Sequence, residues 1–253
     1  MNITWNAEKY TDDFSFVHQY GSGAAELVDC ERGSSILDLG CGNGALTKAL
    51  SEKGFVVAGL DASGELLEIA RKNYPELTFL QGDATEFTLE NPVDAVFSNA
   101  VFHWISKEDQ MAMLSCVQQA LKPGGQFVFE FGGCGNNARI HQALAQAFAE
   151  YGYSYEMPFY FPGIGEYAPM VEKAGFQVRF ALLFDRLTEL KGQDGLRDWI
   201  HMFVKTPFSM IEEEKIREEI ISKAVEHLKE ELYIDGIWYA DYVRIRMKAI
   251  RIV

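Results

Sequence analysis

The chain has 253 residues, of which 48% are hydrophobic and 24% are charged, as expected for one large folded domain or a domain with an insert. Its 23 lysines and arginines against 37 aspartates and glutamates give a formal net charge of −14. Such a charge repels phosphate backbones and anionic lipid surfaces. Nucleic acids and membranes are therefore poor candidate partners.

The cysteines form no CxxC pair and have no histidine at metal-ligand spacing beside them. We expect free, buried thiols in a reducing compartment and no bound metal. The amino-terminal segment is polar and acidic, and no stretch reaches the roughly 18 uninterrupted apolar residues of a membrane span. These features predict a cytoplasmic protein, and they do not indicate an oligomeric state. The four cysteines are Cys30, Cys41, Cys116 and Cys134.

Strand and helix periodicities alternate through the first half of the chain, which is typical of βα units on a parallel sheet. A first helix carries Leu46, Ala49 and Leu50 after a glycine-rich turn. A second helix is predicted to begin after Ser63 as its N-cap and to end at Pro75. In chain order, the predicted strands are 34–39, 55–60, 77–81, 93–98 and 126–131, with a further helix at 107–121.

The rhythm changes after residue 131. The predicted elements are helices at 137–151 and 166–174, long strands at 176–190 and 239–253, and between those strands two helices at 196–204 and 211–232. The later of these two helices has apolar residues at intervals of four on one face, with Glu and Lys on the other. Because the two long strands are expected to pair, the helices between them predict a cap over the ligand-binding edge of the sheet.

A glycine-rich loop, DLGCGNG at residues 38–44, stands between a predicted strand and a predicted helix. Glycines allow a tight turn and let a ligand approach main-chain atoms at the helix N-terminus. Asp61, Asp83 and Asn99 end the next three strands, and such sheets bind ligands at that edge. The alternative is that Asp61 and Asp83 only cap helices or turns. The cofactor-binding candidates are Asp38, Gly40, Cys41, Gly42, Gly44, Asp61, Ala62, Asp83, Ala84, Asn99 and Ala100.

Two cofactors compete for this loop. A dinucleotide carries a pyrophosphate and prefers GxGxxG without a nearby acid, whereas this loop is GxGxG with Asp38 two residues before the first glycine. Asp61 is placed to take both hydroxyls of an adenosine ribose, and Asp83 is placed to accept from the adenine amino group. An acidic neighbourhood also suits the ammonium and sulfonium of S-adenosylmethionine. We therefore favour S-adenosylmethionine.

The segments ILDLGCGNGALT, GDA at 82–84 and FSNAVFHW at 97–104, with Asp61, resemble the class I S-adenosylmethionine-dependent methyltransferases, and specifically the trans-aconitate methyltransferase group. Flanking motifs that begin at Trp5 and at Trp238 (W-x-ADYVRIR) are similar to the same group, so nearly the whole chain is covered. The resemblance implies a seven-stranded Rossmann-like sheet with its last strand antiparallel. It also implies a small-molecule substrate, with a carboxylate oxygen as the favoured acceptor.

We therefore expect a single methyltransferase domain with a helical cap inserted between strands six and seven. The expected divisions are an amino-terminal helical lid at 1–33, a cofactor-binding core at 34–135, the remainder of the core at 136–192 and 236–253, and the cap at 193–235. Two alternatives are an NAD-dependent oxidoreductase on a similar sheet and an S-adenosylmethionine-binding protein without turnover.

His103 is the catalytic candidate, because the loop after the fourth strand is expected to face the acceptor. A hydroxyl or protonated amine acceptor needs a base, whereas a carboxylate does not. The alternative is that His103 packs the start of the next helix. Substrate-pocket candidates are Tyr10, Phe14, Tyr20, Trp104, Phe161 and Trp199, which alternatively join the lid or cap to the core. Arginines that are placed near a carboxylate acceptor are Arg139, Arg179, Arg186 and Arg244, and the pattern leaves open which of them points inward.

Overall fold

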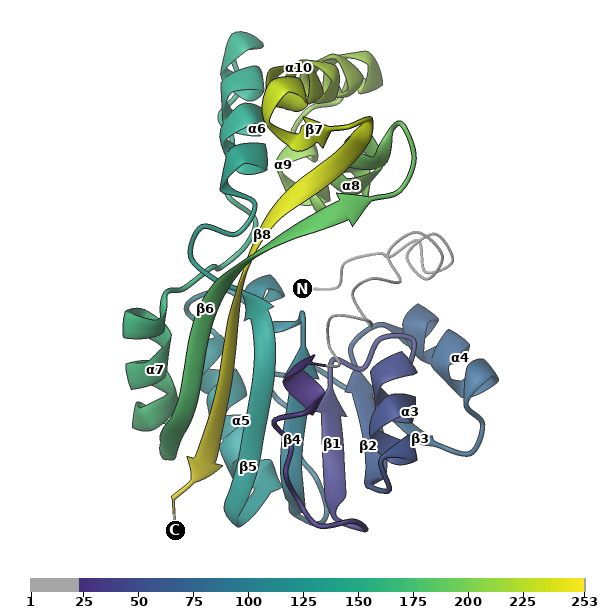
Figure 1. Cartoon of the computed structure of the whole chain (residues 1–253), viewed down its shortest axis with the longest axis vertical. Coiled ribbons are helices and arrows are strands. Elements are labelled where there is room, and N and C mark those ends of the chain that lie inside the picture. Colours follow the sequence, from purple (N-terminus) through teal and green to yellow (C-terminus); the bar gives the residue numbers. More distant parts are fainter. Residues whose placement is uncertain (1–22, 253) are drawn as a thin grey trace.

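Five parallel strands follow the predicted βα rhythm in a computed structural model that describes residues 23–252 (Figure 1). They are β1 (Ser35–Leu39), β2 (Val56–Asp61), β3 (Thr78–Gln81), β4 (Val93–Asn99) and β5 (Leu121–Gly132). The helices between them are α3 (Ala45–Glu52), α4 (Gly64–Asn73) and α5 (Gln110–Ala120), and a short 3-10 turn, η1 (Phe102–Trp104), follows β4. The doubly wound α/β class predicted from the sequence is confirmed.

Local chemistry explains where these elements begin and end. Ser63 caps α4, because its Oγ accepts a hydrogen bond of 3.3 Å from the Leu66 N–H. Glu65 in the first turn and Arg71 and Lys72 in the last turn of α4 complement the helix dipole. β5 begins at Leu121, not at residue 126, because the KPGG segment continues the strand through an irregularity in its pairing with β4.

Two long strands complete the sheet. β6 (Phe176–Leu190) and β8 (Ile237–Arg251) have 15 residues each, and β8 runs antiparallel to both β5 and β6. The strand order is β3-β2-β1-β4-β5-β8-β6. A two-residue strand, β7 (Tyr233–Ile234), also pairs with β8, so the sheet has eight strands and not the expected seven. The antiparallel last strand is confirmed.

The helical cap lies between β6 and β8 in the chain, as predicted. It contains α8 (Gly195–Phe203), α9 (Lys205–Phe208) and α10 (Glu214–Leu232). A further helix, α6 (Ala138–Glu150), packs against α10 in the upper lobe (Figure 1). These helices share one hydrophobic cluster, which includes Phe148, Trp199 and Leu228. β6 and β8 extend from the sheet into this lobe and connect it to the core (Figure 1).

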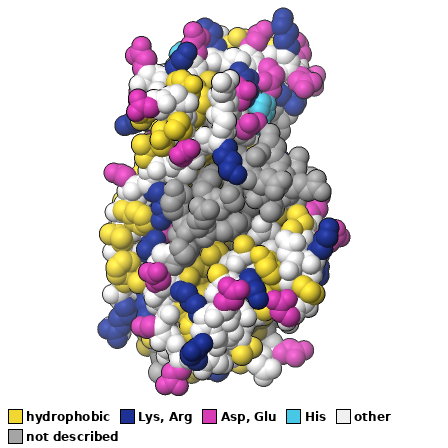
Figure 2. Space-filling view, turned by 45° about the vertical axis from the view of Figure 1, so that its right-hand side comes forward, with side chains coloured by type: hydrophobic (Ala, Val, Ile, Leu, Met, Phe, Trp, Pro, Cys, Tyr) yellow, Lys and Arg dark blue, Asp and Glu magenta, His cyan; other side chains and the backbone are white. Residues whose placement is uncertain are grey.

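The main core lies between the sheet and the helices α5 and α7 (Ile164–Lys173). Phenylalanine side chains from η1, β5 and β6 contact one another there, with ring centroids 4.5 to 5.9 Å apart. Positively and negatively charged side chains are interspersed over both lobes on the face that Figure 2 presents. No helix among residues 23–252 is long and apolar enough to cross a membrane.

All four cysteines are free, as expected, but they are not all buried. Cys41 is buried, Cys30 and Cys116 are partly buried, and Cys134 is exposed. The expectation was wrong for Cys134 because this residue lies in the turn that follows β5 and precedes α6, outside the strands and helices that form the core.

Candidate active site

The glycine-rich loop turns from β1 into α3 through three glycines with positive φ. The φ angles of Gly40, Gly42 and Gly44 are 77°, 55° and 82°, a region that side chains rarely adopt. A Cβ added to Gly40 would clash with Val101, whereas a Cβ added to Gly42 would meet no atom of residues 23–252 within 4 Å. Gly40 is thus required for packing, and Gly42 leaves open space beside the backbone.

Asp61 joins this loop to the start of α4. Its Oδ2 accepts a hydrogen bond of 2.8 Å from the Gly42 N–H, and its Oδ1 accepts one of 2.8 Å from the Ser63 N–H. Burial raises the pKa of the Asp61 carboxyl, while the backbone donors act in the opposite direction. Asp61 therefore does brace a turn, as the alternative interpretation held, and it also lines the cavity described below.

Asp83 lies on the neighbouring strand end and keeps one carboxylate oxygen available. Its Oδ1 accepts hydrogen bonds from the Thr85 N–H at 2.8 Å and from the Thr85 Oγ at 2.7 Å. These two bonds lower the pKa of Asp83 and keep it charged. Among residues 23–252, no partner of Asp83 Oδ2 is present, so this oxygen can accept from a ligand.

A cavity of about 420 Å³ lies at the carboxyl ends of β1 to β4. Four carboxylate residues line it (Asp61, Glu65, Asp83 and Asp109), and the described lining contains no lysine or arginine. The potential in this part of the cavity therefore favours a cation and disfavours a pyrophosphate. The predicted site residues that line it are Gly40, Gly42, Asp61, Ala62, Asp83, Ala84, Asn99, Ala100 and Trp104.

Three predicted cofactor residues lie behind the loop. Asp38 is buried, and its Oδ2 accepts a hydrogen bond of 2.6 Å from the Thr47 Oγ. Burial raises the pKa of Asp38 to about 7, and the Thr47 hydroxyl opposes that shift. Cys41 is also buried, and a Cβ added to Gly44 would lie 2.7 Å from the Phe79 ring. These buried contacts fix the conformation of the glycine-rich loop.

His103 lies beside the cavity, at the junction of the core and the cap. The Gly132 N–H donates to its Nδ1 at 3.5 Å, and its ring lies 5.3 to 5.9 Å from those of Trp104, Phe159 and Phe161. Burial lowers the pKa of His103 well below its usual value, and the charge of Arg244 lowers it further. His103 is therefore neutral at pH 7.

Phe161 and Trp199 reach this junction from the cap side. Both rings lie close to that of His141, at 6.1 and 6.3 Å between centroids, and Trp199 Nε1 donates to the Tyr242 hydroxyl at 2.6 Å. The remaining candidates, Tyr10, Phe14 and Tyr20, lie outside the described residues. The structure thus brings Trp104, Phe161 and Trp199 into one aromatic group around His103 and His141.

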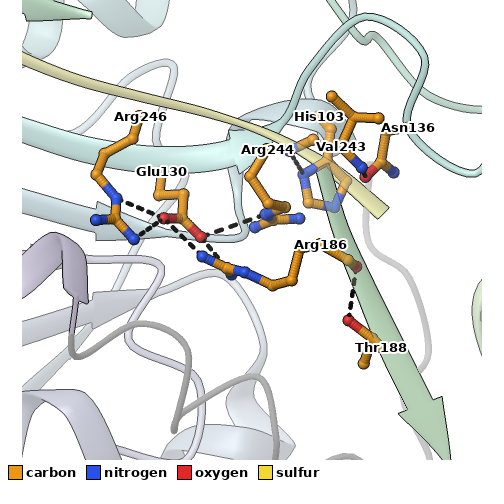
Figure 3. Close-up of polar contacts among 9 residues, drawn as sticks. His103, Glu130, Asn136, Arg186, Thr188, Val243, Arg244 and Arg246 are labelled. Atoms are coloured by element: carbon orange, nitrogen blue, oxygen red, sulfur yellow. Dashed lines mark hydrogen bonds and ion pairs between the residues drawn. The ribbon is translucent and has the colours of Figure 1, made fainter. Parts of the chain in front are cut away.

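One group of charged residues was not predicted from the sequence. Glu130, at the end of β5, has a fully buried side chain and contacts three arginines from β6 and β8 (Figure 3). Its carboxylate lies 2.7 Å from Arg186 Nη1, 3.4 Å from Arg244 Nε and 2.6 Å from Arg246 Nη2. Burial alone would raise the pKa of Glu130, but the three guanidinium groups lower it overall. We call these four residues the Glu130 cluster.

A sequence signal for this cluster did exist. Glu130 interrupts the apolar strand FVFEF, and a carboxylate in a buried strand needs a cationic partner. Arg186 and Arg244 were both among the four arginines named from the sequence. Their partner was not identified because it lies 56 and 114 residues away in the chain.

Comparison with known proteins agrees with this geometry. Residues 36–125 match the family described as the methyltransferase domain. The fold resembles that of phosphoethanolamine N-methyltransferase 2 from Haemonchus contortus in complex with S-adenosyl-L-methionine, with a TM-score of 0.57 and 20% identity, over 93% of this chain and 53% of that one. Residues 36–125 therefore carry a methyltransferase domain, and the chain has the fold of a methyltransferase that was solved with S-adenosyl-L-methionine.

Two proteins with similar sequences are relatives of this chain. An uncharacterized methyltransferase of Schizosaccharomyces pombe is 29% identical over 97% of both chains. The trans-aconitate 2-methyltransferase of Azoarcus sp. is 32% identical over 127 residues, so the alignment spans about half of each protein, 48% of this chain and 48% of that relative. The resemblance seen in the sequence motifs is confirmed, and the nicotinamide alternative is not supported.

The residues present fit S-adenosylmethionine. The cavity has the size of a small-molecule site, and its lining is acidic, as a ligand with an ammonium and a sulfonium requires. Asp61 and Asp83 are fixed by backbone donors in positions from which they can accept hydrogen bonds from an adenosine. The open space at Gly42 lets a ligand approach the loop backbone.

Proposed function

We propose that this chain transfers the methyl group of S-adenosylmethionine to a carboxylate oxygen of a small organic acid. The observation that carries the proposal is Arg244, a buried cation beside the neutral His103 at the core–cap junction. The cofactor side of the site is acidic, whereas this side is basic. An anionic acceptor is attracted to the basic side and kept away from the acidic cavity.

Little side-chain chemistry is required for such a transfer. S-adenosylmethionine supplies an activated methyl group on a sulfonium, and a carboxylate is already ionised at pH 7. The task of this chain is to hold the acceptor in line, and positioning of this kind contributes about 7–11 kcal/mol to lowering a barrier. Asp61 and Asp83 orient the cofactor end, while Trp104, Phe161 and Trp199 exclude water from the acceptor end. The name of the Azoarcus relative, trans-aconitate 2-methyltransferase, also supports a carboxylic acid acceptor.

The low pKa of His103 favours its packing role over that of a base. Its Nδ1 is occupied by the Gly132 N–H, so the proton of the neutral ring resides on Nε2. In this form His103 is a hydrogen-bond donor toward an acceptor and not a proton acceptor. A reaction that needs no base is consistent with this arrangement.

The test is a panel of small carboxylic acids, amines and phenols incubated with the protein and S-adenosylmethionine. We expect methyl esters from acids, detected by mass spectrometry and by release of methanol in alkali. Methylation of amines or phenols alone would contradict the proposal. Binding of S-adenosylmethionine with no turnover on any compound would favour the non-catalytic alternative.

The His103→Asn variant serves as the control for mechanism. A general base contributes roughly 10²–10⁴-fold to a rate. Because a carboxylate needs no base, we expect the kcat of this variant to stay within about threefold of that of the wild type. A loss of a hundredfold in kcat, in a variant that still binds S-adenosylhomocysteine normally, would instead make His103 a base.

A further inference from the structure

We propose that Arg244 is the anion-binding residue of the acceptor site and that Glu130 is the positioning residue that holds it there. This inference rests on the proposed function, because the anion is a carboxylate of the methyl acceptor. Neither residue lines the acidic cofactor cavity. Both belong to the Glu130 cluster, which lies beside His103 (Figure 3).

Arg244 is buried but its hydrogen-bonding capacity is only partly used. The side chain is 7% exposed, and its Nε lies 3.4 Å from Glu130 Oε1. The guanidinium carbon lies 5.8 Å from the centroid of the Tyr242 ring. Among residues 23–252, no hydrogen-bond partner of its two terminal nitrogens is present. A carboxylate matches the planar geometry of a guanidinium group with two parallel hydrogen bonds.

The surroundings of Arg244 point to the acceptor side of the active site. Its charge acts on His103, whose neighbour Trp104 lines the cofactor cavity. Tyr242, two residues before Arg244 on β8, accepts the hydrogen bond from Trp199 of the cap. Arg244 therefore lies close to His103 and Tyr242, between the core and the cap.

Glu130 fixes this arginine without neutralising the cluster. One carboxylate faces three guanidinium groups among the described residues. Arg186 and Arg246 each contact Glu130 at 2.7 Å or less, so they anchor its carboxylate between them. Glu130 then accepts from Nε of Arg244 and leaves the terminal nitrogens directed elsewhere.

The charge balance also indicates which carboxylate Arg244 holds. A carboxylate that becomes an ester loses its charge, and its hydrogen bonds to a guanidinium weaken as the reaction proceeds. Binding energy of that kind would stabilise the substrate more than the transition state. Arg244 is therefore suited to a carboxylate group that stays ionised during the reaction.

The experiment measures binding without turnover, by titrating oxalate, succinate, glutarate and tricarballylate into the complex with S-adenosylhomocysteine. We expect at least one of these acids to bind the wild type, and Arg244→Gln to weaken that binding at least tenfold with S-adenosylhomocysteine affinity unchanged within twofold. The control is Arg179→Gln, which removes an exposed arginine of β6 and should change neither affinity. Arg244→Lys keeps the positive charge but lacks the planar guanidinium group, and we expect an intermediate loss of acid affinity.

The role of Glu130 is tested by measuring KM and kcat of its variants. For an acid that is turned over, Glu130→Gln should raise KM at least tenfold with kcat within about threefold, and Glu130→Asp should restore part of the affinity. A purely structural role would instead lower S-adenosylhomocysteine affinity and acid affinity together. Failure of all four acids to bind the wild type, or equal binding by Arg244→Gln, would overturn the assignment.

These outcomes separate the two proposals. If the wild type methylates only amines or phenols while acid binding depends on Arg244, the carboxylate acceptor is wrong and the anion site stands. If acids are methylated with a KM that Arg244→Gln leaves unchanged, the proposed function stands and the anion site is wrong.

Discussion

Asp61 braces the fold from a position in which its side chain can also accept from a ligand. Each of its oxygens accepts a backbone N–H, one from the glycine-rich loop and one from the start of α4. A carboxylate oxygen has more than one lone pair, so both oxygens can still accept from ribose hydroxyls. The sequence interpretation treated capping and cofactor binding as alternatives, and the geometry permits them together.

Replacement of Asp61 tests the ligand role. Asp61→Ala removes two acceptors of a charged group, each worth about 1.5–3 kcal/mol. We expect the affinity for S-adenosylmethionine to fall at least tenfold by calorimetry. Glu65→Gln is the matched control, because Glu65 also lines the cavity but is exposed, and it should change the affinity less than threefold. Equal affinity for Asp61→Ala and wild type would leave Asp61 as a cap only.

Residues at consecutive strand ends could be predicted, whereas the Glu130 cluster could not. Parallel strands bring their carboxyl ends to one edge, so local motifs at Asp61 and Asp83 suffice to place them together. The partners of Glu130 lie on β6 and β8, and their side chains reach it only through the antiparallel register that pairs Glu130 with Arg246 and Phe184 with Arg244. No local pattern determines that register.

At the scale of elements, two glycines of the glycine-rich loop have different surroundings. Both Gly40 and Gly42 have positive φ, which costs an alanine about 1–2 kcal/mol. Within the described part of the chain, a methyl group on Gly40 would strike Val101 in the turn after β4, whereas one on Gly42 would strike no atom. The same substitution at the two positions therefore has different consequences.

We expect Gly40→Ala to lower the free energy of unfolding by about 3 kcal/mol or more in urea titrations. This loss exceeds the cost of the positive φ angle, because the added methyl group also strikes Val101. Gly42→Ala should lower it by only about 1–2 kcal/mol but weaken S-adenosylmethionine binding at least tenfold, because its methyl group occupies the open space of the loop. Equal stability losses, with normal cofactor binding by Gly42→Ala, would show that this space is not used by the ligand.

Element boundaries followed from the sequence where side-chain alternation is strong. β6 has the bounds predicted from its alternating pattern, and the α4 cap is at Ser63 as expected. β5 starts earlier than predicted because Pro and Gly are normally turn signals, yet here they occupy an irregular strand beginning. β7 and α9 have two and four residues, too short to show any periodicity.

At the scale of the whole molecule, β6 and β8 connect the two lobes. Each strand contributes to the core sheet at one end and to the cap cluster at the other, where Leu190 and Trp238 are buried. Trp199 and Tyr242 add a hydrogen bond within the same region. Cap and core thus share backbone pairing and not only a surface contact.

This continuity predicts a single unfolding transition. In a variant with Trp5→Phe and Trp104→Phe, the remaining tryptophans Trp199 and Trp238 report on the cap, and far-UV circular dichroism reports on the whole chain. We expect both signals to give the same urea midpoint, as two-state unfolding requires. A cap midpoint lower by more than about 1 M urea would show that the cap unfolds on its own.

The order of strands in the sheet also constrains how the chain can fold while it is synthesised. β8 lies between β5 and β6, although β6 precedes it by 46 residues in the chain. Until Ile237 and the residues after it emerge from the ribosome, β6 cannot join the described sheet, and its apolar side chains have no strand beside them. A pause in translation within α10 would therefore leave β6 unpaired, with its apolar side chains exposed. Intermediates of this kind aggregate or bind chaperones.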